Sequence, residues 1–240
     1  MRLGIYLNPA LKLRLNANRG EPDPALLAAM SEMAGAELIL AGWNPDGGLV
    51  TERDIRRIRE ATQADLLLIV PALAGIADKI AQLSPNGVIL VESNWDGVRP
   101  AQPLPAAVQP EQLSSTAAAY NSAGVPVSAL LEPELQNVKA AARANLTGVV
   151  LDCLKFSQSA TDEEAENALS ELENASIAAG KFGLVSAYLN GLNYRNIGYL
   201  AALPSASEFY VGDALIQRAL LVGLDVAVRD LCQMIFHHNR

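Results

Sequence analysis

The chain alternates short apolar runs with longer segments in which apolar residues recur at helical spacing. Eight of the apolar runs have the length of strands, and nearly all are separated by helical segments. Strands that alternate with helices form parallel sheets. Eight such units within 240 residues favour one closed (β/α)8 TIM barrel over an open sheet. The expected strands cover residues 2–8, 37–42, 65–70, 87–92, 125–132, 148–154, 183–189 and 208–215.

The segments between these runs carry signals for helix ends. Thr51 with Asp54 is typical of a capped helix start, and Thr161 precedes an acidic first turn. No shift in composition marks a linker, so we expect residues 1–240 to form a single domain that carries an extra helical element or elements. The expected helices cover residues 24–35, 52–63, 72–83, 111–123, 134–145 and 162–180, followed by a closing helical pair.

Composition and charge narrow the possible partners. Half of the residues are hydrophobic, which suffices for a large core. The formal net charge of −8 and the absence of a basic stripe argue against nucleic acid as a partner. The longest apolar run, residues 66–77, is too short to span a bilayer, so no membrane partner is expected. Cys153 and Cys232 stand alone in apolar surroundings and indicate reduced thiols in a cytoplasmic protein.

In a (β/α)8 barrel the active site lies at the carboxyl ends of the strands. The residues expected there include no histidine, because His237 and His238 lie at the end of the chain, where we expect a solvated tail. Proton transfer would fall to a carboxylate or a lysine, and Asp152 with Lys155 could form such a pair. Lys155 could also act as a Schiff-base nucleophile, or the two residues could form an ordinary ion pair in a loop. No spacing typical of metal ligands occurs, and no cofactor is implied.

Two glycines and two tryptophans near the strand ends also have alternative interpretations. Gly191 and Gly212 follow consecutive strands and could present backbone N–H groups to a phosphate, or they could only shape their loops. Trp43 and Trp95 could stack on a ligand or cover the mouth of the barrel.

Four segments of the chain resemble one known family in order and spacing. They are 3-LGIYLNPALKLRLNANRGEPDP-24, 50-VTERDIRRIR-59, 190-NGLNYRNIGYLAALP-204 and 211-VGDALIQRALLVGLDVAV-228. The pattern resembles the pyridoxine 5'-phosphate synthases of vitamin B6 biosynthesis along nearly the whole chain. The resemblance implies a (β/α)8 barrel and a homo-oligomer, either a dimer or an octamer built from dimers. It also implies the condensation of 1-deoxyxylulose 5-phosphate with 3-amino-2-oxopropyl phosphate by histidine and glutamate acids and bases.

The chain departs from this family at every acid–base position that the resemblance identifies. The run Tyr6, Asn8 and Pro9 replaces an Asn-x-Asp-His pattern, and Gly42 with Asn44 replaces His-x-Arg. Leu49, Ile69, Asn190 and Asp213 stand where the family carries histidine, glutamate, histidine and histidine. Arg19, Gly191 and Gly212 match residues that the family uses to bind phosphate. The carboxylate of Asp213 would oppose a phosphate at that place.

These departures leave several hypotheses about function. In the first, the chain is a family member that has lost the synthase reaction and binds a small ligand, for example a phosphorylated metabolite, or a protein partner. In the second, it is an enzyme of changed chemistry that uses Asp152, Lys155, Glu92 or Asp213. In the third, it is a scaffold whose barrel mouth is filled by Tyr6, Trp43 and Ile69. An active synthase is a further alternative.

Overall fold

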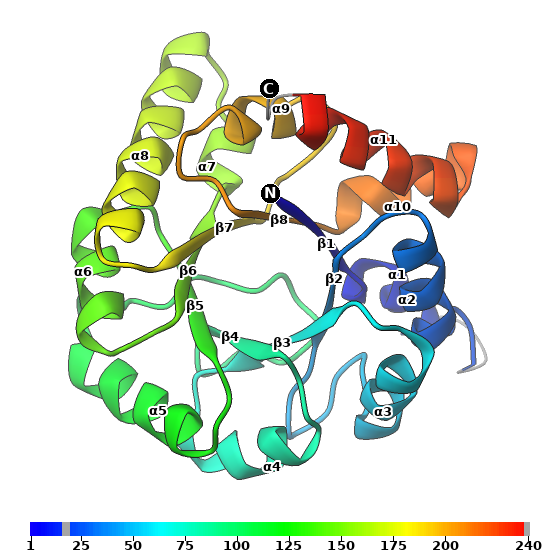
Figure 1. Cartoon of the computed structure of the whole chain (residues 1–240), viewed down its shortest axis with the longest axis horizontal. Coiled ribbons are helices and arrows are strands. Elements are labelled where there is room, and N and C mark those ends of the chain that lie inside the picture. Colours follow the sequence, from blue (N-terminus) through cyan, green and yellow to red (C-terminus); the bar gives the residue numbers. More distant parts are fainter. Residues whose placement is uncertain (16–19, 238–240) are drawn as a thin grey trace.

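The computed structural model describes residues 1–15 and 20–237 and shows a closed barrel of eight parallel strands surrounded by helices (Figure 1). Consecutive strands pair with one another, and the last strand closes the barrel on the first. This is the (β/α)8 TIM barrel that the sequence pattern predicts. The strands are β1 (Arg2–Tyr6), β2 (Leu38–Gly42), β3 (Asp65–Pro71), β4 (Gly87–Val91), β5 (Val127–Leu131), β6 (Gly148–Asp152), β7 (Val185–Leu189) and β8 (Glu208–Val211).

The helices lie outside the barrel (Figure 1). Both predicted caps form: the Thr51 hydroxyl accepts the Asp54 N–H at α3, and the Thr161 hydroxyl accepts the Glu164 N–H at α8. Within residues 1–15 and 20–237, no helix has the length and apolar character needed to cross a bilayer. The helical elements are α1 (Asn8–Leu11), η1 (Lys12–Leu15), α2 (Pro24–Met33), α3 (Glu52–Ala61), η2 (Ala74–Ile76), α4 (Ala77–Gln82), α5 (Pro110–Ser122), α6 (Leu135–Arg143), α7 (Leu154–Ser157), α8 (Asp162–Lys181), α9 (Ile197–Ala201), α10 (Asp213–Val222) and α11 (Leu224–His237).

The structure corrects the predicted end of the eighth strand. The apolar run 208–215 was expected to be one strand, but β8 ends at Val211 and Asp213 already begins α10. Gly212 interrupts the extended backbone, with φ −130° and ψ −84°, and the Asp213 carboxylate suits the first turn of a helix. The short helices α1, α7 and α9 follow β1, β6 and β7 and were not predicted, because four or five residues do not establish a helical period.

The core has two layers that follow the alternation of side chains along each strand. Leu38 and Leu40 of β2 face the barrel interior, where they belong to the same apolar cluster as Ile69 and Trp95. Ile39, between them, belongs to the larger layer between barrel and helices. Because both faces of each strand are covered, the strands read as continuous apolar runs.

Candidate functional site

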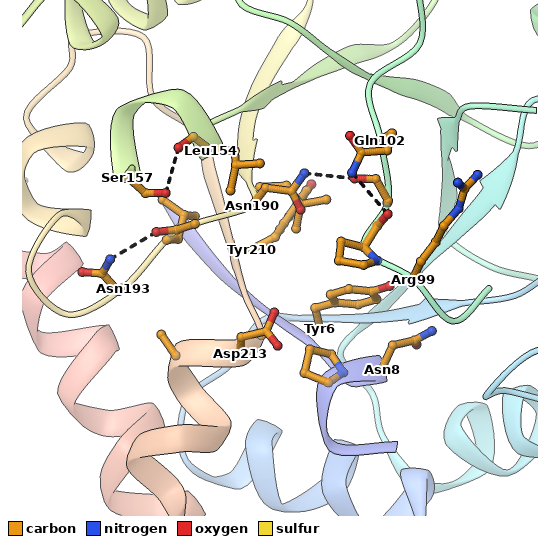
Figure 2. Close-up of a pocket in the computed structure, with 18 of the residues that line it drawn as sticks. Tyr6, Asn8, Arg99, Gln102, Leu154, Ser157, Asn190, Asn193, Tyr210 and Asp213 are labelled. Carbon is orange, nitrogen blue, oxygen red and sulfur yellow. Dashed lines mark hydrogen bonds between the residues drawn. The ribbon is translucent and has the colours of Figure 1, made fainter. Parts of the chain in front are cut away.

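A cavity of about 470 Å³ opens at the carboxyl ends of β1, β7 and β8 (Figure 2). The segment after β4 and the short helices η1 and α7 form the rest of its wall. This is the face of the barrel where the strand-end rule places ligands. The residues of the predicted site that line the cavity are Tyr6, Asn8, Pro9, Asn190, Gly191, Gly212 and Asp213.

The segment between β4 and α5 fills the rest of the barrel mouth with Trp95. This indole is 1 % exposed and belongs to the apolar cluster of the barrel interior. Its Nε1 donates a hydrogen bond of 2.8 Å to the carbonyl oxygen of Arg99. A Cβ atom placed on Gly42 would lie 2.6 Å from Trp95 Cη2, so the indole occupies the space that a side chain at the end of β2 would need.

Trp43 does not take part in closing the mouth. It packs among the residues between barrel and helices, and the Lys79 ammonium lies 5.2 Å from the centre of its ring. The filling by Tyr6, Trp43 and Ile69 that would favour the scaffold hypothesis therefore does not occur at Trp43, and of the two tryptophans it is Trp95 that lies in the barrel interior. Ile69 lies fully buried in the interior cluster, and Tyr6 is half-buried at its edge.

The side-chain amides of Asn8 and Asn44 form hydrogen bonds with backbone groups. Asn8 Oδ1 accepts the Gly42 N–H at 2.8 Å, and Asn8 Nδ2 donates to the carbonyl oxygens of Gly42 at 3.2 Å and Gly97 at 3.3 Å. Asn44 donates to the Trp95 carbonyl and accepts the Asp46 N–H at 2.8 Å. Both side chains therefore fasten the segment after β4 over the mouth of the barrel.

Asn190 lies between the cavity and a buried carboxylate. Its Nδ2 donates to Asp152 at the end of β6 and, at 3.1 Å, to the carbonyl oxygen of Ala101. Asp152 is 5 % exposed and also accepts the Leu154 N–H at 2.8 Å. Burial raises the pKa of Asp152, although its hydrogen bonds with Asn190 and the Leu154 N–H oppose the rise. Asn190 has φ 63°, a left-handed conformation that Asn tolerates better than most residues.

The raised pKa of Asp152 predicts a pH dependence of stability. The folded protein retains a proton on this group above its ordinary pKa of 3.8, so it binds more protons than the unfolded chain. The free energy of unfolding therefore falls as the pH rises from about 4 through the raised value. Asp152→Asn removes this titration, and we expect the stability of the variant relative to wild type to improve as the pH rises from about 4 through the raised pKa of Asp152.

Urea unfolding at a series of pH values measures this difference. The exposed Asp78→Asn is the matched control and should follow the wild-type curve. A stability difference between Asp152→Asn and wild type that stays constant with pH would contradict the prediction.

Lys155 does not pair with Asp152. Its Nζ lies 2.8 and 2.7 Å from the two carboxylate oxygens of Glu171 on α8, and its side chain is 62 % exposed. The hydrogen bond to Glu171 raises the pKa of Lys155. Lys155 lines a separate surface depression with Glu132 and Glu134 and is not part of the cavity wall.

Gly191 and Gly212 let other elements approach the cavity wall closely. A Cβ on Gly191 would lie 2.1 Å from Ser157 Oγ on α7, and a Cβ on Gly212 would lie 2.8 Å from Pro9 Cγ. Gly212 precedes α10, whose first residue, Asp213, faces the cavity beside Tyr6 (Figure 2). Burial, with the nearby Asp213 carboxylate, raises the pKa of the Tyr6 phenol. Arg19, the expected phosphate ligand, lies outside the described residues.

Several residues of the cavity wall were not predicted. Ser157 lies on α7, and Gln102 lies in the irregular, proline-rich segment after β4. The sequence signal for Gln102 was the position of that segment after a strand, where functional loops concentrate. Ser157 had no such signal, because its place depends on the packing of α7 against Gly191.

The eight parallel strands, with a cavity at the carboxyl ends of β1, β7 and β8, define the chain as a (β/α)8 barrel. Residues 3–237 match the family described as Pyridoxal phosphate biosynthesis protein PdxJ. Curated pyridoxine 5'-phosphate synthases resemble it over their whole length. That of Synechococcus sp. is 30 % identical over 233 residues, covering 97 % of this chain and 98 % of the relative. That of Syntrophotalea carbinolica is 30 % identical over 236 residues, with coverage of 97 % and 98 %. The chain therefore belongs to the PdxJ family.

Solved structures also share this fold at low sequence identity. Thiamine phosphate pyrophosphorylase from Pyrococcus furiosus matches with a TM-score of 0.62 at 13 % identity, covering 100 % of this chain and 97 % of that one. KGPDC from Streptococcus mutans matches with a TM-score of 0.66 at 12 % identity, with coverage of 100 % and 99 %. At these identities the likeness concerns the fold alone.

Proposed function

We propose that this chain is a PdxJ-family barrel that does not carry out the synthase condensation and binds a small polar molecule in the cavity at the ends of β1, β7 and β8. The proposal rests on the residues at the ends of β1, β2, β3 and β7, on their hydrogen bonds and on their lack of titratable groups. Asn8 is bonded to the backbone of Gly42 and Gly97, and Asn190 is bonded to Asp152 and Ala101. At β2 and β3 the corresponding residues are Gly42 and Ile69, which carry no titratable group.

The chemistry of the condensation requires several proton transfers, and each positioned acid or base contributes typically about 10²–10⁴-fold to such steps. An amide side chain does not ionise near neutral pH and so cannot serve as a general acid or base. Even two such losses would lower the rate by about 10⁴-fold or more. The cavity itself is retained, and Gly191 and Gly212 still lie in its wall. The features that remain therefore suit binding better than the family reaction.

A second candidate is an enzyme of changed chemistry, and the observation that favours it is Asp152. This carboxylate is buried beside Asn190 with a raised pKa, as a general acid requires. A Schiff base on Lys155 has less support. A nucleophilic amine must lose its proton, whereas the bond to Glu171 raises the pKa of Lys155. Lys155 also lines a different depression and is not in the wall of the cavity.

The loss of synthase activity is tested by complementation of a vitamin B6 auxotroph that lacks its own pyridoxine 5'-phosphate synthase. We expect no growth without added pyridoxine, whereas the Synechococcus relative under the same promoter should restore growth. The purified protein, given 1-deoxyxylulose 5-phosphate and 3-amino-2-oxopropyl phosphate, should form product at least about 10⁴-fold more slowly than that relative. Growth comparable to the control would refute the proposal.

We also propose that the protein forms a homo-oligomer and is located in the cytoplasm. Leu220 and Leu221 on α10 expose large apolar side chains, 77 % and 85 % accessible. A homo-oligomer would cover such residues, as the family resemblance implies. Both cysteines are free thiols, as expected for a protein of the cytoplasm.

A further inference from the structure

Asp213 is the single acidic side chain in the described wall of the cavity. It stands at the first position of α10, and Figure 2 shows its carboxylate turned toward the open centre, beside the ring of Tyr6. It forms no ion pair with any residue in the described part of the chain. A carboxylate with no partner in a cavity attracts a cation and repels an anion.

The other charged side chains of the wall do not neutralise Asp213. Arg99 is engaged elsewhere: its guanidinium lies 2.9 Å from Glu92 Oε1 and donates to the carbonyl oxygen of Asn94 at 3.0 Å. Lys12 lines the cavity from η1, and no carboxylate of the described residues pairs with it. The negative charge of Asp213 is therefore available to a ligand.

Asn190 supplies a second, independent indication of the ligand's chemistry. Both hydrogens of its amide nitrogen are used, one by Asp152 and one by the carbonyl oxygen of Ala101. A flipped amide would place Oδ1 against these two acceptor oxygens, so the orientation is fixed. The atom left without a partner among the described residues is the acceptor Oδ1. Asn190 thus offers the cavity an acceptor rather than a donor.

The aromatic residues of the wall fit the same kind of ligand. Tyr6 and Tyr210 both line the cavity, where Tyr6 is half-buried and Tyr210 is 3 % exposed with its hydroxyl donating to Glu208. Aromatic faces attract ammonium groups.

We propose that the cavity binds a small molecule through a positively charged amino group, with Asp213 as its ionic partner, and that Asp213 excludes phosphate from the start of α10. This inference rests on the proposed function, because it names the class of ligand for the same cavity. A phosphate at the start of α10 would meet the Asp213 carboxylate, whereas Lys12 supplies an ammonium group to the wall from η1.

Three aromatic probes of different charge test the inference: benzylamine, benzyl alcohol and phenyl phosphate. Binding is measured at low salt by ligand-observed NMR and by titration of the full chain. In the wild type we expect benzylamine to bind at least about tenfold more tightly than benzyl alcohol, and phenyl phosphate not to bind. In Asp213→Asn the preference for the amine should disappear, and phenyl phosphate should bind at least about tenfold more tightly than to wild type.

The controls separate the site from net charge and from folding. Asp78→Asn removes the same charge from an exposed position on α4, outside the cavity wall, and should leave all three affinities unchanged. If Asp213→Asn does not fold, Asp213→Ser keeps a polar residue at the start of α10 and takes its place.

Three outcomes would overturn the inference: no binding of benzylamine by wild type, an affinity for the amine that persists in both Asp213 variants, or tighter binding of phenyl phosphate than of benzylamine by wild type. Complementation decides separately whether the synthase reaction is lost. Tight phosphate binding without complementation would refute the amino-group inference alone, whereas complementation would refute the proposed function.

Discussion

Trp95→Ala is expected to lower the free energy of unfolding by about 4 kcal/mol, the largest effect of any single substitution considered for this protein. The indole is almost fully buried at the carboxyl end of the barrel interior and packs against the Cα side of Gly42. Removing it would leave a void that the rigid strand ends cannot close, because β1 and β2 are fixed to each other through Asn8. It would also remove the hydrogen bond to the Arg99 carbonyl.

Urea unfolding followed by far-UV circular dichroism measures this loss. Trp95→Phe is the graded control: it keeps most of the apolar volume and loses the hydrogen bond, so its cost should be about 1–2 kcal/mol. A loss below about 1 kcal/mol for Trp95→Ala would show that the segment after β4 collapses into the space, and that Trp95 only covers the barrel.

Gly191→Ala is expected to cost about 3 kcal/mol, the second largest effect. Two separate contributions to the loss of stability add at this position. The backbone has φ 71°, which costs a residue with a Cβ about 1 kcal/mol or more. The added methyl would also lie 2.1 Å from Ser157 Oγ and 2.6 Å from Ser157 Cβ, so α7 would have to move away from the loop.

Gly183→Ala isolates the first of these terms. Gly183 has φ 74°, but no atom lies within 4 Å of the place of its Cβ, so only the backbone term of about 1 kcal/mol should remain. Adding Ser157→Gly to Gly191→Ala should recover a large part of the difference, because it removes both clashing atoms. Equal losses for Gly191→Ala and Gly183→Ala in thermal or urea unfolding would contradict the proposed contact.

The fold could be predicted from the sequence because several separate signals along the chain indicate the same topology. Eight apolar runs, each buried on both faces, are separated by helices whose starts carry local caps such as Thr51 with Asp54. A misjudged boundary, such as the end of β8, does not change the topology. Tyr6, Asn190 and Asp213 line one cavity, as expected from their positions at strand ends and the rule that ligands bind there.

The side-chain details of the site could be predicted only in part. Trp43 follows Leu40 and Gly42 on β2, so the two-residue period alone places it on the outer face, although it was expected at the mouth. The partners of Asp152 and Lys155 depend on contacts between distant elements. Asn190 and Glu171 lie 38 and 16 residues away along the chain, and no local pattern indicates which carboxylate turns inward.

The turn after β7 shows how a loop can be retained while the residue before it changes. Asn193 and Asn196 cross-link this turn, because Asn196 Oδ1 accepts the Asn193 N–H at 2.8 Å and Asn196 Nδ2 donates to the Gly191 carbonyl at 2.9 Å. Tyr194 fastens the turn to α11 by donating to the Ala227 carbonyl at 2.8 Å. None of these bonds involves the side chain of Asn190, whose own constraints are its left-handed backbone, with φ 63°, and its bonds to Asp152 and Ala101.

The contact between Gly42 and Trp95 makes a substitution at either position alone unfavourable. A larger residue at position 42 meets the indole at 2.6 Å, and a smaller residue at position 95 leaves a void, so each change alone is destabilising. A Cβ at position 42 would also lie 2.6 Å from Asn8 Nδ2, so a smaller residue at position 95 relieves only one of these two close contacts. The path from this chain toward a barrel with an acid or base at the end of β2 therefore passes through a less stable intermediate whichever step comes first. The close packing of Gly42 against both Trp95 and Asn8 makes the introduction of an acid or base at the end of β2 difficult one substitution at a time.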